Sequence, residues 1–66
     1  MKVNGEIVEL TEAKTLSALL SELNYDERRI AVEHNGRIVP KEEYSTLGLN
    51  NDDIIEIVMF MGGGSR

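Results

Sequence analysis

The sequence predicts a single α+β domain, in which a mixed sheet of four to five strands carries one main helix packed on one face. Two Asn-Gly pairs, at residues 4–5 and 35–36, lie between short apolar segments and indicate β-hairpins. Leucines at helical spacing between the two pairs indicate one amphipathic helix. An apolar run from residue 54 to 61 indicates a strand in the middle of the sheet. We place the domain at residues 1–61 of the 66.

The first expected element is a hairpin. Residues 2–3 form one arm and residues 6–10 the other, because Asn and Gly both tolerate the positive φ of a type I′ turn. Alternation along the second arm directs Val8 and Leu10 toward the core. Residues 11–14 then form a polar connection to the helix.

The helix is expected to begin after Thr15, whose hydroxyl can accept a hydrogen bond from a free amide of the first turn. The leucines that follow are spaced i, i+3, i+4 and i+7, which makes one stripe along a helix of two to three turns. We assign this stripe to the core, and it consists of Leu16, Leu19, Leu20 and Leu23.

A second hairpin is predicted after a loop at residues 24–29, which has mixed charge and no period. Residues 30–33 form one strand, with Ile30 and Val32 inward, and residues 37–39 return beside it. The proline that follows ends the return strand, because it has no N–H to donate to a ladder.

The segment before the last strand closes the core. Residues 41–44 predict a short helical turn, and Leu47 and Leu49 seal the bottom of the core. Residues 50–53 are rich in side chains that hydrogen-bond their own backbone, which is typical of a turn. The final strand therefore begins at Ile54.

Alternation along the final strand places Ile55 and Ile57 in the core and Glu56, Val58 and Phe60 on the opposite face. An outward Phe next to the glycines that follow the strand is typical of a docking patch. We therefore predict that Phe60 and Val58 contact a partner protein.

The order of these elements suggests how they are joined. A lone helix with one apolar stripe must lie across one face of the sheet. The first and last strands can then pair in parallel, with the helix in a right-handed crossover between them. This is the β-grasp arrangement.

Three glycines, Gly62, Gly63 and Gly64, follow the last strand without a polar linker. They predict a flexible, glycine-rich tail at residues 62–66, thin enough to enter a slot in which any Cβ would clash. The alternative is a fraying terminus or a linker, for which Gly and Ser are common. The position of the glycines, directly after a rigid strand, favours insertion into a partner.

Composition excludes several classes of function. Twelve acidic and seven basic side chains give a net charge of −5, which argues against nucleic acid and anionic lipid as partners. The absence of cysteine excludes disulfides and thiolate metal sites, and is consistent with a cytoplasmic protein. The N-terminus does not resemble a secretory signal, and no apolar run reaches the ~20 residues of a membrane helix.

The sequence contains no recognisable catalytic or metal site. His34 is the only histidine, has no nucleophile or second histidine beside it, and is interpreted as a plain surface residue. Glutamates are spread along the chain and indicate a solvated acidic surface, with Glu42 and Glu43 as the only adjacent pair. No glycine-rich loop of the ATP-binding type is present. The chain is therefore predicted to bind no cofactor itself.

The chain from Met1 to Gly64 resembles the ThiS family, the ubiquitin-like β-grasp sulfur carriers of thiamine biosynthesis, which are related to MoaD. The resemblance is strongest in the closing run that ends in glycines. The matching pieces are Val3–Glu6, Leu16–Leu20, Ile30–Glu33, Asn35 and Gly36, Ile38–Lys41, Tyr44, Ile55–Val58, Phe60 and Gly62–Gly64.

The resemblance implies a function for the tail. An E1-like adenylating enzyme (ThiF-type) would use ATP to adenylate the carboxylate of Gly64, with Gly62 and Gly63 inserted into its active site. The chain would be a carrier protein and a co-substrate of that enzyme, and not an enzyme itself. A sulfur donor would then convert Gly64 to a thiocarboxylate, which gives its sulfur to a thiazole synthase (ThiG-type).

Ser65 and Arg66 depart from this pattern, because only a terminal carboxylate can be activated. We expect that a protease removes them or that they lie outside the native sequence. Two alternatives remain: a sulfur carrier for another pathway (molybdopterin, cysteine or tRNA thiolation), or a ubiquitin-like interaction module that is never activated.

Overall fold

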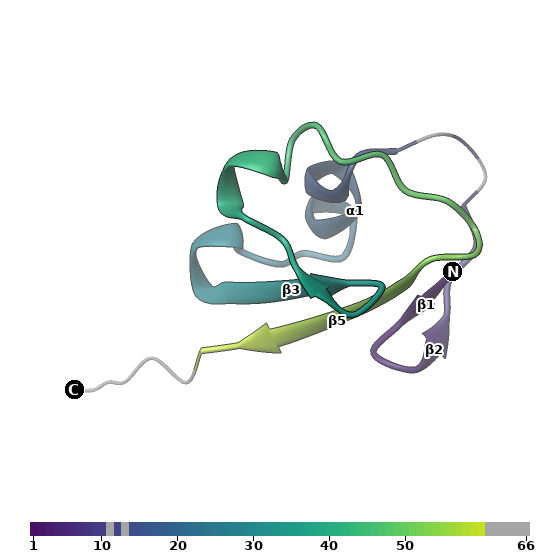
Figure 1. Cartoon of the computed structure of the whole chain (residues 1–66), viewed down its shortest axis with the longest axis horizontal. Helices are drawn as coiled ribbons and strands as arrows, with labels where there is room; N and C mark the ends of the chain where they lie inside the picture. The colour runs from purple at the N-terminus through teal and green to yellow at the C-terminus, as the bar shows by residue number, and fades with distance from the viewer. Residues whose placement is uncertain (11, 13, 61–66) are drawn as a thin grey trace.

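The computed structural model describes residues 1–10, 12 and 14–60. It contains one five-stranded mixed sheet in the order β2-β1-β5-β3-β4, and α1 lies against one face of it (Figure 1). This confirms the predicted α+β class. The elements are β1 (Lys2–Val3), β2 (Glu6–Ile7), α1 (Leu16–Glu22), η1 (Glu27–Arg29), β3 (Ile30–His34), β4 (Arg37–Ile38), η2 (Lys41–Glu43) and β5 (Ile54–Met59).

The last strand, β5, is the centre of the sheet, as predicted. It pairs in parallel with β1 on one side and antiparallel with β3 on the other. The first and last strands therefore lie side by side, as the β-grasp arrangement requires. The predicted tail at residues 62–66 lies outside the described residues, so the domain boundary after residue 61 stays a prediction.

Both hairpins turn on the predicted Asn-Gly pairs. Asn4 and Gly5 have φ values of 52° and 84°, and Asn35 and Gly36 have 52° and 87°. All four lie in the left-handed region that a type I′ turn needs and that Asn and Gly tolerate. The second arm of the first hairpin is shorter than predicted, since the backbone N–H of Leu10 donates to Asn51 Oδ1 at 3.0 Å rather than continuing a ladder.

The helix begins as predicted, because Thr15 Oγ1 accepts from the N–H of Ala18 at 3.2 Å. The prediction was wrong for Leu23, which is 37% exposed. The helix ends at Glu22, and Asn24 adopts a left-handed φ of 67°, so the chain turns away before Leu23 can face the core. The other three leucines of the stripe are buried.

The core lies between α1 and the inner face of the sheet. Val8, Leu10 and Leu47 pack against it from its rim, and Leu49 is buried, all as predicted. Tyr44, at the end of the predicted helical turn, is also buried, although its role in the core was not predicted. The buried apolar side chains are Met1, Val3, Leu16, Leu19, Leu20, Ile30, Val32, Val39, Tyr44, Leu49, Ile55 and Ile57.

Candidate functional site

The candidate site is the C-terminal end of β5, where the chain leaves the sheet. The N–H of Phe60 donates to the carbonyl of Arg29 at 2.8 Å, which holds the strand end against the start of β3. On the other side, the N–H of Ile57 donates to Asn4 Oδ1 at 2.7 Å. Hydrogen bonds from both neighbouring segments thus hold the end of β5 in place.

The predicted partner-inserting residues, Gly62, Gly63 and Gly64, lie outside the described residues. Their proposed role therefore stays a prediction. The structure does describe the strand that leads toward them, up to Phe60.

Val58 and Phe60 lie where a docking patch was expected. Their side chains are 57% and 55% exposed, whereas Ile55 and Ile57 are buried on the core side. Val58 of β5 pairs with Ala31 of β3, and its side chain lies on the face of the sheet away from α1. The exposure of the two side chains is a finding, and their contact with a partner stays a prediction.

Two acidic residues are neighbours on this outer face. Glu33 on β3 and Glu56 on β5 are directly opposite in the register, and Ile38 on β4 is opposite Glu33. Like charges directly opposite one another destabilise a sheet. Neither carboxylate forms an ion pair within the described part of the chain.

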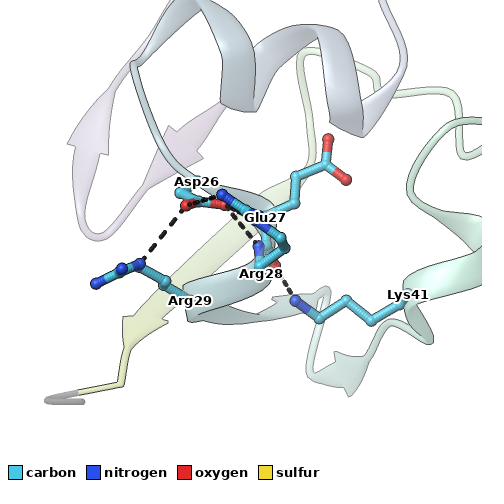
Figure 2. Close-up of polar contacts among 5 residues, drawn as sticks. All are labelled: Asp26, Glu27, Arg28, Arg29 and Lys41. Atoms are coloured by element: carbon cyan, nitrogen blue, oxygen red, sulfur yellow. Dashed lines mark hydrogen bonds and ion pairs between the residues drawn. The ribbon is translucent and has the colours of Figure 1, made fainter. Parts of the chain in front are cut away.

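The turn η1 supplies the carbonyl that holds Phe60, and polar contacts keep it in shape. Figure 2 shows Asp26 between Arg28 and Arg29, whose Nε atoms lie 3.2 and 3.6 Å from its carboxylate oxygens. Asp26 also accepts from the N–H of Arg28 at 3.0 Å, which caps the turn. These hydrogen bonds, first the one from the Arg28 side chain, hold the pKa of the Asp26 carboxyl below its ordinary value.

A lysine from the second half of the chain also fastens η1. Lys41 Nζ donates to the backbone carbonyl of Glu27, while the Glu27 carboxylate points away from the other labelled side chains (Figure 2). The prediction for residues 24–29 was a loop, and the structure has a capped 3-10 turn at Glu27–Arg29 within it. The capped turn was missed because only the spacing from Asp26 to Arg28 signals it, and the lysine is far away in sequence.

His34 is not a plain surface residue, which corrects the prediction. Its Nε2 lies 2.9 Å from Asp53 Oδ2, and Asp53 is only 6% exposed. Asn35 Nδ2 and the N–H of Asn50 also donate to this carboxylate, at 3.2 and 2.9 Å. Burial alone raises the pKa of the Asp53 carboxyl, but the hydrogen bonds from His34, Asn50 and Asn35 outweigh it and lower the pKa.

This His-Asp pair lies at the wrong end of β5 to act on the tail. His34 is opposite Ile55 near the start of the strand, whereas the tail follows its end. A strand of six residues is roughly 20 Å long. We therefore assign the pair a structural role at the start of β5.

The described residues contain no group of three side chains able to hold a metal ion. Within the same residues, no helix is long and apolar enough to cross a membrane. What the site can offer chemically is thus a rigid strand end with an exposed apolar patch beside it.

Comparison with known proteins relates this chain to ThiS proteins over nearly its whole length. The model of the ThiS family matches residues 1–64. The sulfur carrier protein ThiS of Bacillus subtilis is 35% identical over 65 residues, which are 97% of this chain and 98% of that protein. The crystal structure of ThiS from Geobacter metallireducens superposes with a TM-score of 0.77 and 32% identity, covering 96% of each chain, which confirms the β-grasp fold.

This chain is also similar to part of a longer protein. The thiazole synthase of Paramagnetospirillum magneticum is 48% identical over 63 residues. These residues are 96% of this chain and 19% of that protein. The chain thus spans about a fifth of the length of this relative.

Proposed function

Because the chain belongs to the ThiS family of sulfur carrier proteins of thiamine biosynthesis, we propose that the carboxylate of Gly64 is the group that carries the sulfur. The observation that supports this most directly is the family match, which extends through residue 64. The end of β5, held at Ile57 and Phe60, provides the fixed base from which such a tail would reach into an enzyme.

The chemistry proceeds in two steps, because a free carboxylate does not exchange an oxygen for sulfur at a useful rate. The adenylating enzyme joins the Gly64 carboxylate to the α-phosphorus of ATP and releases pyrophosphate. A sulfur donor then attacks the acyl carbon, AMP leaves, and a thiocarboxylate remains; such activation divides one difficult substitution into two easier ones. The carrier supplies only the carboxylate, and the enzyme supplies the ATP site.

The docking surface for the adenylating enzyme is the exposed pair Val58 and Phe60, with the Glu33 and Glu56 carboxylates beside it. Apolar anchors with neighbouring charges are the usual composition of an interface centre and its rim. A basic side chain of the partner placed between the two carboxylates would relieve their mutual repulsion.

The acceptor of the sulfur is a thiazole synthase. The similarity of this chain to part of the Paramagnetospirillum magneticum thiazole synthase supports that partnership, since a stretch like this chain makes up 19% of that protein. The adenylating enzyme and the thiazole synthase would use the same tail in turn.

Activation requires a free carboxylate on Gly64, so Ser65 and Arg66 must be absent from the active form. The test compares a chain ending at Gly64 with the chain ending at Arg66, each given the cognate adenylating enzyme and ATP. The shorter chain should support pyrophosphate exchange and, with a sulfur donor, gain about 16 Da as sulfur replaces oxygen at the activated carbon. The longer chain should be inert.

Two results would contradict the proposal. If the longer chain is equally active while its mass shows Arg66 still attached, Gly64 is not the site. If the shorter chain stays inert with adenylating enzymes that activate other ThiS proteins, the interaction module becomes the better interpretation.

A further inference from the structure

The central strand β5 has one open edge near its C-terminal end. Phe60 donates its N–H to Arg29, on the β3 side. The main-chain N–H and C=O groups of the even-numbered residues of the strand therefore point toward β3, and those of the odd-numbered residues point toward β1. On the β1 side, Ile55 accepts from Asn4 N–H at 2.9 Å, and the side chain of Asn4 takes the N–H of Ile57. Beyond that point the β1–β2 hairpin has turned away, as Figure 1 shows.

Three main-chain groups are consequently left open on this edge. They are the carbonyl of Ile57 and both the N–H and the carbonyl of Met59, none of which has a hydrogen-bond partner among residues 1–10, 12 and 14–60. The Met59 side chain is 59% exposed as well. Proteins commonly protect such edges with lysine, proline or a bulge, and the stretch from Ile57 to Met59 has none of these.

The second feature is a hollow of about 280 Å³, lined by residues of the β1–β2 hairpin and of the chain that follows it and α1. Asn4 connects the two features, because it lines the hollow and also bonds to β5. Leu23, which the core leaves partly exposed, contributes an apolar wall, and Glu6 contributes a carboxylate with no ion pair in the described part of the chain. The lining residues are Val3, Asn4, Glu6, Val8, Leu23 and Tyr25.

These features match what an added strand needs. Main-chain groups on an open edge bind a strand of any sequence, and pockets for its alternate side chains provide specificity. A strand placed next to Met59 would direct every second side chain toward the α1 side of the sheet, where the hollow lies. An apolar side chain of such a strand would meet Val3, Val8 and Leu23 in the hollow, and a basic residue beside it would meet Glu6.

We propose that the open edge of β5, at Ile57 and Met59, binds an extended segment of the adenylating enzyme as an additional strand, with an apolar side chain of that segment in the hollow. This inference rests on the proposed function, since it names how the same partner grips the base of the tail. The edge is separate from the Val58 and Phe60 patch, which lies on the face of the sheet.

The test removes one donor from the backbone and leaves every side chain in place. Chains ending at Gly64 are made by chemical synthesis, one with an N-methyl group on the amide of Met59 and one with it on the amide of Ile38. Ile38 is the matched control, because β4 is the opposite edge of the sheet and its N–H also points outward. Circular dichroism and thermal melting check that both variants fold.

Calorimetry with the cognate adenylating enzyme should show at least roughly 10-fold weaker binding for the Met59 variant, since the methyl group removes a hydrogen bond and also blocks close approach of a strand. The Ile38 variant should bind like the unmodified chain. Equal binding by all three chains would overturn the edge proposal and leave the carrier function intact. If the unmodified chain is itself neither bound nor adenylated, the proposed function fails and the edge proposal fails with it.

Discussion

Asn4 Oδ1 accepts a hydrogen bond from the backbone N–H of Ile57 at 2.7 Å, joining residues 53 positions apart. Asn35 repeats this arrangement in the second hairpin, where its Oδ1 accepts from the N–H of Ile54 at 2.8 Å. Each asparagine thus adopts the left-handed conformation of its turn and also binds the central strand. The two hairpins hold β5 from both sides through equivalent side chains.

The contact of Asn4 should contribute measurably to stability. Asn4→Gly keeps the positive φ but removes the acceptor, and we expect it to lower the free energy of unfolding by about 1 to 2 kcal/mol. Asn4→Ala should cost about 1 to 2 kcal/mol more, because alanine is also strained in the left-handed region. Urea denaturation measures both.

The matched control for this prediction is Asn24→Gly. Asn24 has a similar φ of 67°, and its side chain makes no hydrogen bond within the described residues. This variant should be neutral. An Asn4→Gly variant as stable as the unmodified chain would show that the contact to Ile57 adds nothing.

Stability should also depend on pH through Asp53. The pKa of its carboxyl is lower in the folded chain than the ordinary 3.8, so the charged form stabilises the fold at neutral pH. This contribution is lost as the pH falls from about 5, through the ordinary pKa of 3.8, toward the lower pKa of the carboxyl in the folded chain. Asp53→Asn should be less stable than the unmodified chain at pH 7, and the difference should shrink at pH 3 in thermal melts. A constant difference would exclude this carboxyl as its cause.

Phe60 should act as an anchor of the interface and not of the fold. Phe60→Ala should weaken binding to the adenylating enzyme by about 1 to 4 kcal/mol, as is typical of an interface anchor, with an unchanged melting temperature. Ile7→Ala is the control, because Ile7 is also exposed but lies on β2, away from the tail. A lower melting temperature with unchanged affinity would instead place Phe60 among the residues that stabilise the fold.

The like-charged neighbours on the outer face lead to a prediction in which stability and binding change in opposite directions. Glu56→Lys replaces repulsion with attraction to Glu33, and should stabilise the isolated chain by about 0.2 to 1 kcal/mol. The same variant should associate more slowly with a basic surface of the partner. Stopped-flow association at rising ionic strength should show the difference shrinking, because salt screens it.

The control for charge alone is Glu42→Lys. Like Glu56→Lys, it changes the net charge from −5 to −3, but the substitution lies on η2 and not on the sheet. If both variants slow association equally, the net charge of the chain and not the Glu33 and Glu56 pair determines the rate.

The turns, the start of the helix and the family resemblance could be predicted from the sequence alone. Each Asn-Gly pair specifies its turn because the required φ values belong to those two residues themselves, and Thr15 caps its helix through a bond only three residues long. The alternation of the last strand correctly separated its buried isoleucines from the exposed Val58 and Phe60. Patterns of this kind depend on neighbours in the chain, so they can be read without the fold.

Contacts between residues far apart in the chain could be found only in the folded structure. The pairing of His34 with Asp53, the bond from Asn4 to Ile57 and the exposure of Leu23 all depend on the register between strands and on where the helix ends. The open edge at Met59 has the same origin, because it exists where β1 stops short of the end of β5. Such features follow from the relative lengths and registers of segments far apart in sequence, and no local pattern carries that information.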